Sequence, residues 1–213
     1  PRLGDEHEPV LYRIVAARSG TRLDYDPYIP AGAPTELSAG EAVIFPAGTG
    51  DAFVVRTQDA DYPIYLAAHM TGGDEYGGSG DPEFVNVIPA GQYLNSYGFY
   101  ADKTFAETSL VIVRAKAADG QFKPVWLDCA GDLDDFTPIG TRGQYELRRV
   151  DLSRKRRAGE KFGDKVCTTG VRHMRSEGPF TATVWGWDHY ASYAYPGGSA
   201  QRTLVTTPLA DVR

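Results

Sequence analysis

The sequence contains no apolar stripe with the spacing of an α-helix. No window of about eleven residues keeps apolar side chains at positions i, i+3 and i+4. Short runs of β-branched and aromatic residues alternate instead with turn formers. Glycine occurs 24 times and proline 14 times, beside 13 Tyr, 9 Phe and 3 Trp. The pattern predicts an all-β fold.

The predicted strands fall into two groups, separated by a polar, glycine-rich stretch at residues 71–83. Before it, about five strands recur at a spacing of roughly 8–12 residues, which is typical of sandwiches. Afterwards the same rhythm resumes, with strands expected at 84–89, 97–100, 109–116, 122–127, 145–152, 180–187 and 190–195. We therefore expect tandem antiparallel β-sandwich units with short strands and Gly/Pro-rich turns. The first unit would cover residues 1–75 and the second residues 76–213.

The composition excludes several classes of protein. Hydrophobic residues make up 42% and charged residues 23% of the 213, which argues against a disordered chain. The net charge of −6 gives no basic field for phosphates, so we expect no nucleic-acid partner. The longest aliphatic run, residues 110–113, is too short to span a bilayer, so we expect no direct membrane insertion.

Cys129 and Cys167 are the two cysteines of the chain. They form no C-x-x-C motif, which argues against redox-active and zinc-ribbon sites. We expect a structural disulfide, worth about 3–4 kcal/mol in the chain-entropy model. The alternative is two buried free thiols in a cytosolic protein. A tyrosine-rich, all-β chain with two cysteines favours the disulfide and an extracellular location.

Three acids, Asp132, Asp134 and Asp135, form the densest carboxylate cluster. Calcium prefers several carboxylates on a flexible loop, but the EF-hand spacing is missing. A solvated turn is the simpler interpretation, and the same holds for Asp24 and Asp26. Calcium is the one cofactor that this pattern leaves open.

Residues 154–157 form a basic run in which Arg154, Arg156 and Arg157 are candidates for contact with an acidic partner. Because the whole chain is acidic, a solvated loop is the alternative.

The aromatic stretch at residues 185–195 is the most distinctive segment. Tyrosine and tryptophan give large contact areas for few rotatable bonds, so Trp187, Tyr190 and Tyr193 are candidates for ligand contact. Alternation places Trp185 with Trp187 on one strand face. The alternative is aromatic packing inside a sandwich.

A hydrolase is the weakest functional hypothesis. Ser192, His189 and an aspartate could be combined into a catalytic triad. No G-x-S-x-G elbow supports such a triad, so we expect no enzyme.

Several segments together resemble a known family. They include Gly80-Asp81-Pro82, Leu127-Asp128-Cys129-Ala130-Gly131, Trp185-Gly186-Trp187, and residues 12–17, 20–21, 40–45, 84–93, 104–113, 172–173, 179–180 and 192–198. These segments resemble the N-terminal domain of IgGFc-binding proteins, most of all the bacterial versions in secreted or surface proteins, including those of myxobacteria. The resemblance covers most of residues 10–200 and implies that an N-terminal piece of the first unit is missing.

The resemblance implies an extracellular, non-enzymatic module for binding or adhesion, with a protein or glycan ligand on a cell surface. It supplies no binding residues for this chain. The alternative function is a structural subunit of a surface assembly or fibre, which would self-assemble through its sheet edges.

Overall fold

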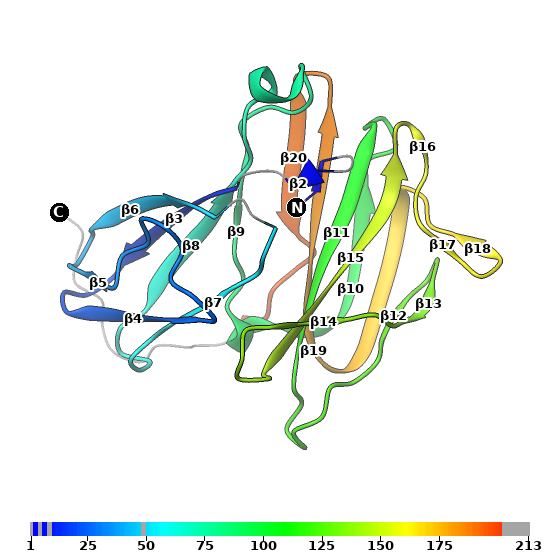
Figure 1. Cartoon of the computed structure of the whole chain (residues 1–213). Coiled ribbons are helices and arrows are strands. Elements are labelled where there is room, and N and C mark those ends of the chain that lie inside the picture. Colours follow the sequence, from blue (N-terminus) through cyan, green and yellow to red (C-terminus); the bar gives the residue numbers. More distant parts are fainter. Residues whose placement is uncertain (1, 4–5, 8–9, 48–49, 202–213) are drawn as a thin grey trace.

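The computed structural model describes residues 2–3, 6–7, 10–47 and 50–201 (Figure 1). Within these ranges the only helical elements are two 3-10 turns, η1 (Gly73–Tyr76) and η2 (Ala90–Gln92). All strand pairs of the described sheets are antiparallel. The predicted all-β fold is confirmed. Neither described helical turn is long or apolar enough to cross a membrane.

The first half of the chain folds into two facing sheets. One has the order β6-β3-β8-β9 and consists of β3 (Leu11–Ala16), β6 (Ala42–Pro46), β8 (Ile64–His69) and β9 (Phe84–Asn86). The other has the order β5-β4-β7 and consists of β4 (Thr21–Asp26), β5 (Glu36–Leu37) and β7 (Val54–Thr57). Alternate side chains of both sheets, among them Ile14, Leu23 and Phe45, meet in one core. We call this part the sandwich.

Strand β9 follows the boundary expected after residue 75, yet it belongs to the first sheet. It pairs with β8, with Val85 opposite Ala68. The division of the chain at residue 75 stays a prediction, and the strand pairing assigns residues 84–86 to the sandwich.

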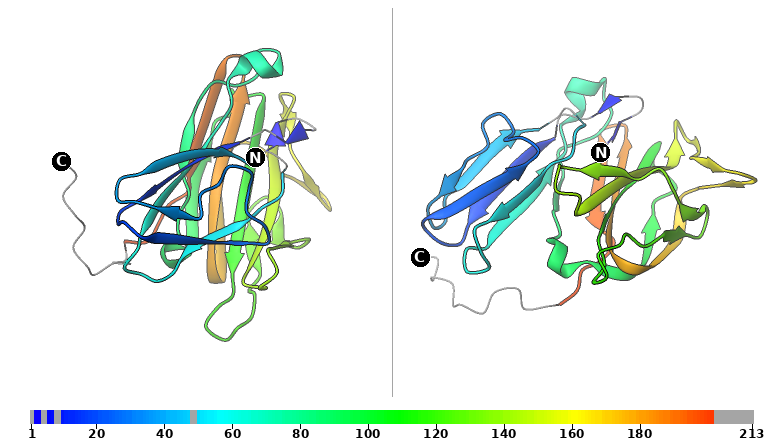
Figure 2. Two further views of the ribbon diagram at one scale, coloured as in Figure 1. Left: turned by 60° about the vertical axis from the view of Figure 1, so that its left-hand side comes forward. Right: turned by 60° about the horizontal axis from the view of Figure 1, so that its bottom comes forward.

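The second half forms a nine-stranded sheet that curls around its own core (Figure 2). Its main path has the order β13-β12-β19-β11-β15-β14, with β10 and β20 on β19 and β16 on β15. The strands are β10 (Leu94–Ala101), β11 (Glu107–Ala115), β12 (Val125–Leu127), β13 (Gly131–Leu133), β14 (Thr137–Ile139), β15 (Tyr145–Arg154), β16 (Arg157–Ala158), β19 (Gly170–Asp188) and β20 (Ala191–Pro196). Two short hairpins complete the described chain: β1 (Arg2–Leu3) with β2 (Glu6–His7), and β17 (Lys161–Phe162) with β18 (Lys165–Val166). We call the nine strands the curled sheet.

The predicted disulfide between Cys129 and Cys167 is confirmed, with the two Cα atoms 5.0 Å apart. Cys167 is fully buried and both cysteines pack in the core of the curled sheet. The bond joins the turn between β12 and β13 to the segment that precedes β19. It therefore closes the curled sheet around its core.

Candidate functional site

A groove of about 820 Å³ lies between the sandwich and the curled sheet. Its volume falls within the roughly 300–1,000 Å³ that is usual for ligand sites. Tyr12, Phe53 and Leu66 are among the residues that line it from the sandwich. Val113 and Leu147 are among those that line it from the curled sheet.

Strand alternation explains why the curled sheet presents an apolar outer face to this groove. On β11, Leu110 and Ile112 point into the sheet's own core, so Val111 and Val113 must point the other way. Val113 lies opposite Leu147 of β15, which therefore shares that face. One face of β11 thus packs in the core of the curled sheet, and the other face lines the groove.

One end of the groove is closed by an apolar contact between the two halves of the chain. Trp185 and Trp187 of β19 pack against Val10, Met70 and Val85 of the sandwich side. The two indole rings are stacked, with centroids 6.5 Å apart. We call this contact the tryptophan junction. Burial of such large apolar side chains holds the two halves together at this end.

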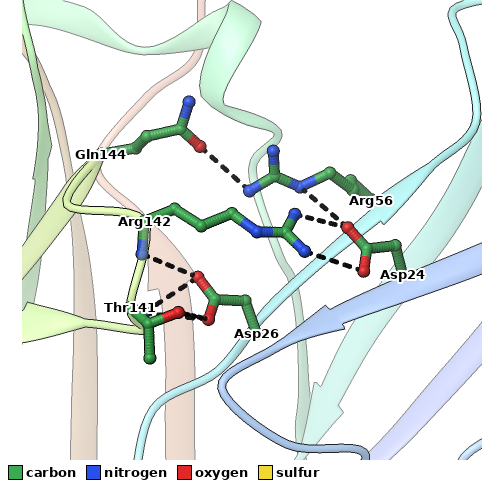
Figure 3. Close-up of polar contacts among 6 residues, drawn as sticks. All are labelled: Asp24, Asp26, Arg56, Thr141, Arg142 and Gln144. Carbon is green, nitrogen blue, oxygen red and sulfur yellow. Dashed lines mark hydrogen bonds and ion pairs between the residues drawn. The ribbon is translucent and has the colours of Figure 1, made fainter.

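A second, polar contact joins the halves near the groove (Figure 3). The carboxylate of Asp26 accepts hydrogen bonds from the backbone N–H of Thr141 at 2.9 Å and of Arg142 at 3.3 Å. The hydroxyl of Thr141 donates to the same carboxylate at 2.8 Å. Arg142 donates from both terminal nitrogens to Asp24, and Arg56 donates to Gln144. We call this contact, between β4, β7 and the turn from β14 to β15, the polar junction.

The polar junction stabilises its own charges. Hydrogen bonds from the backbone of Thr141 hold the pKa of Asp26 below its ordinary value. The hydrogen bond from Arg142 does the same for the pKa of Asp24. Both carboxylates are therefore ionised at neutral pH, and their oxygens can accept the hydrogen bonds from Thr141 and Arg142.

Replacing Gly140 by alanine is expected to weaken the polar junction. Gly140 has φ +73°, and an added Cβ would lie 2.3 Å from the Oδ2 atom of Asp26. The matched control is Gly143→Ala, where φ is +62° but the added Cβ would meet no atom within 4 Å. The control should lose only the backbone term of about 1–2 kcal/mol. Urea unfolding should show a larger loss for Gly140→Ala, and equal losses would contradict the described contact.

Two tyrosines of the groove lining are neutral. Burial raises the pKa of Tyr12 to about 12, so its phenol is neutral under physiological conditions. Burial also raises the pKa of Tyr93, which lines the same groove. Arg149 supplies a positive charge in the lining, and its Nη2 donates to the carbonyl of Gly50 at 3.0 Å.

A comparison with protein families bears on this arrangement. The sequence model of a family described as IgGFc binding protein matches residues 1–186. The chain belongs to that family. A search of curated proteins and a search of solved structures each gave no match. The resemblance found in the sequence is thus confirmed, and the matched family residues supply both walls of the groove.

The three aromatic residues predicted to contact ligand differ in how far they are buried. Trp187 is only 1% exposed and its ring lies in the tryptophan junction, so the alternative of packing has structural support and its role in ligand contact stays a prediction without any. Tyr193 packs against the core of the curled sheet, edge-on to Phe105 at 4.6 Å. Tyr190 is 57% exposed, and its role in binding stays a prediction.

The basic run is largely engaged in local contacts. Arg156 forms an ion pair with Asp188 and donates to the carbonyl of Thr104 at 3.0 Å. Arg154 lies 3.9 Å from the carboxylate of Asp151. Arg157 is exposed on β16. The groove lining contains none of these arginines, and their role in binding stays a prediction.

The acidic cluster is spread along exposed backbone. Asp132 lies on β13 opposite Trp126, and Asp134 and Asp135 follow it. In the part of the chain that the structure describes, no three His, Cys, Asp or Glu side chains gather closely enough to hold a metal ion. Calcium binding by Asp132, Asp134 and Asp135 gains no support from this arrangement.

The triad suggested for a hydrolase is not supported by the local contacts. The hydroxyl of Ser192 accepts a hydrogen bond from the backbone N–H of Asp81 at 2.9 Å. His189 contacts the ring of Tyr190 at 4.7 Å between centroids. Ser192 therefore fastens the 71–83 segment to β20.

No pattern in the sequence indicated the groove or the polar junction. The groove depends on residues as far apart as Phe53 and Leu147, whose proximity no local pattern reveals. Asp24 and Asp26 did stand out as paired acids, but they were interpreted as a solvated turn, and the sequence gave no sign of Thr141 and Arg142 as their partners.

Proposed function

We propose that this chain is an extracellular, non-enzymatic binding module of a bacterial secreted or surface protein, and that it recognises a protein ligand in the groove. The observation that carries the proposal is the apolar groove of about 820 Å³ that both halves of the family domain build together. The family's description names antibody Fc, a protein, as the bound partner.

The chemistry of the groove favours protein over glycan. Apolar groups make up the larger part of its lining and include Val111, Val113 and Leu147, which offer no hydrogen bonds to sugar hydroxyls, beside polar side chains such as Asn86 and Gln92. Burying hydroxyl groups without partners is costly, whereas apolar protein side chains gain free energy on the same surface. A protein segment with apolar anchors is therefore the better fit.

The disulfide supports the extracellular location. Cys129 and Cys167 are bonded, and disulfides persist mainly in oxidising compartments.

A binding panel with a groove-filling variant tests the proposal. The full chain is immobilised and exposed to an IgG Fc fragment, a set of extracellular matrix proteins and a glycan array. Val113→Trp puts bulk into the groove, whereas Val171→Trp adds the same bulk at a site that is 59% exposed and outside the lining. We expect a protein of the panel to bind, with Kd raised at least about tenfold by Val113→Trp and unchanged by Val171→Trp.

The panel also has outcomes that overturn the proposal. Binding confined to the glycan array would replace the protein ligand by a sugar. Equal Kd values for both tryptophan variants would move the site away from the groove. Concentration-dependent polymers in sedimentation, with no ligand bound, would favour the structural-subunit alternative.

A further inference from the structure

Strand β7 is the outermost strand of its sheet, whose order is β5-β4-β7. The backbone N–H of Leu23 in β4 donates to the carbonyl of Thr35, on the β5 side, at 2.9 Å. The main-chain N–H and C=O groups of successive strand residues point to opposite edges of the strand. The main-chain groups of Asp24 and Asp26 therefore point toward β7. The backbone of Arg22 agrees, since it donates toward Gln58 on that side.

The same alternation fixes the direction of the main chain in β7. In the pairing of β4 with β7, Asp24 lies opposite Arg56 and Asp26 lies opposite Val54. The main-chain groups of Arg56 and Val54 therefore form hydrogen bonds with β4. The N–H and C=O groups of Val55 and Thr57 therefore point away from β4. Among the described residues, none forms a hydrogen bond with these outward main-chain groups.

This open edge borders the groove. All four residues of β7, Val54–Thr57, belong to its lining. The opposite wall is the apolar face of the curled sheet that includes Val111 and Val113. A chain entering the groove thus meets unpaired main-chain groups on one side and apolar side chains on the other.

The far edge of the sandwich is protected differently. On β6, the N–H of Ala47 donates to the carbonyl of Val10, on the β3 side, at 3.0 Å. Alternation then turns Pro46 outward, and proline has no N–H to offer a neighbouring strand. Strand β7 contains no proline. Pro46 therefore removes one donor from the outer edge of β6, whereas β7 keeps the outward N–H groups of both Val55 and Thr57 at the groove.

We propose that the groove binds an extended segment of the protein ligand, which adds as a strand to the open edge of β7. The inference rests on the proposed function, because it names the form in which the protein ligand is held. Main-chain hydrogen bonds to Val55 and Thr57 provide affinity, and alternate apolar side chains on the curled-sheet face provide specificity. Four residues of β7 extend over about 13 Å, which sets a core of four to six ligand residues.

The groove lining carries charges of both signs, from Arg56 and Arg149 and from Asp51 and Asp59, so it sets no sign of charge for the segment. Its apolar wall favours β-branched or aromatic residues at alternate positions of the segment.

A display library of random linear dodecapeptides, selected on the full chain, tests the proposal. The selected peptides are then measured against Val55→Pro, which removes an outward N–H in the groove. The matched control is Ile44→Pro, an outward position on β6 that is 60% exposed. We expect Val55→Pro to raise Kd at least about tenfold and Ile44→Pro to leave it unchanged.

A second measurement does not depend on the proline variants folding. Each selected peptide is made with N-methyl groups at odd or at even positions of its core. An added strand bonds through alternate amides, so one series should lose binding to the unaltered protein and the other should keep it. Equal effects of both series, or a library without binders, would overturn the inference.

These results separate the inference from the proposed function. If Val113→Trp abolishes binding of a panel protein while Val55→Pro and both methyl series have no effect, the groove binds protein but not as a strand. If no panel protein binds, the proposed function fails as well.

Discussion

Replacing both cysteines by alanine is expected to lower the free energy of unfolding by about 4 kcal/mol. The bond closes a loop with a sequence separation of 38 residues, and its loss returns conformational freedom to the unfolded chain. Loss of the buried Cys167 sulfur adds a packing cost in the same direction. For a chain of this size the melting temperature should fall by about 10 °C, which calorimetry can measure.

Thiol titration provides the companion measurement. The denatured, unreduced protein should expose no reactive thiol, because Cys129 and Cys167 are bonded to each other. Two free thiols, or a double variant as stable as the original protein, would contradict the structural role of the bond.

Trp187→Ala is expected to have an effect of similar size. Its side chain is fully buried between the curled sheet and the sandwich, and such a truncation costs about 3–5 kcal/mol through lost burial and the cavity left behind. Tyr190→Ala is the matched control, because Tyr190 lies nearby but is exposed. The control should stay within about 0.5 kcal/mol of the original protein.

Urea unfolding of the two variants distinguishes packing from recognition. A loss confined to Trp187→Ala would confirm that the tryptophan junction joins the halves. Equal stability of both variants would contradict the buried position of Trp187, and would return it to the surface candidates.

The sequence predicted the class of fold because strand formation here is a local property. The strand predicted at residues 109–116 corresponds closely to β11, Glu107–Ala115. The glycine and proline positions separated the strands correctly in most places. Both cysteines could be paired on composition alone, since no competing cysteine exists.

Strand lengths and long-range pairing were harder to predict. Residues 180–187 were expected as a strand, but β19 runs from Gly170 to Asp188. Its first part carries the charged residues Arg172, Arg175 and Glu177, which hide the strand pattern. Pairing with β10 and β12 on both edges stabilises this part as a strand despite its polar composition.

The candidate site could not be predicted for a related reason. Val111 and Val113 look like ordinary core residues in the sequence, and only the packing of the sandwich beside them makes them a groove floor. The aromatic residues near the end of the chain were predicted to contact ligand. In the structure Trp187 packs in the tryptophan junction, and Tyr193 packs against the core of the curled sheet. Exposure depends on which strand faces meet, and no local pattern of residues along the chain indicates that long-range packing.

Hydrogen exchange in the complex shows whether ligand binds in the groove between the two halves. Exchange of backbone amides is measured for the free chain and for its complex with the tightest-binding protein of the panel. We predict slower exchange at Val55 and Thr57 by at least about tenfold, with no change at Ile44 on the opposite edge of the sandwich. Protection at Ile44 or around Tyr190, with β7 unchanged, would contradict the account.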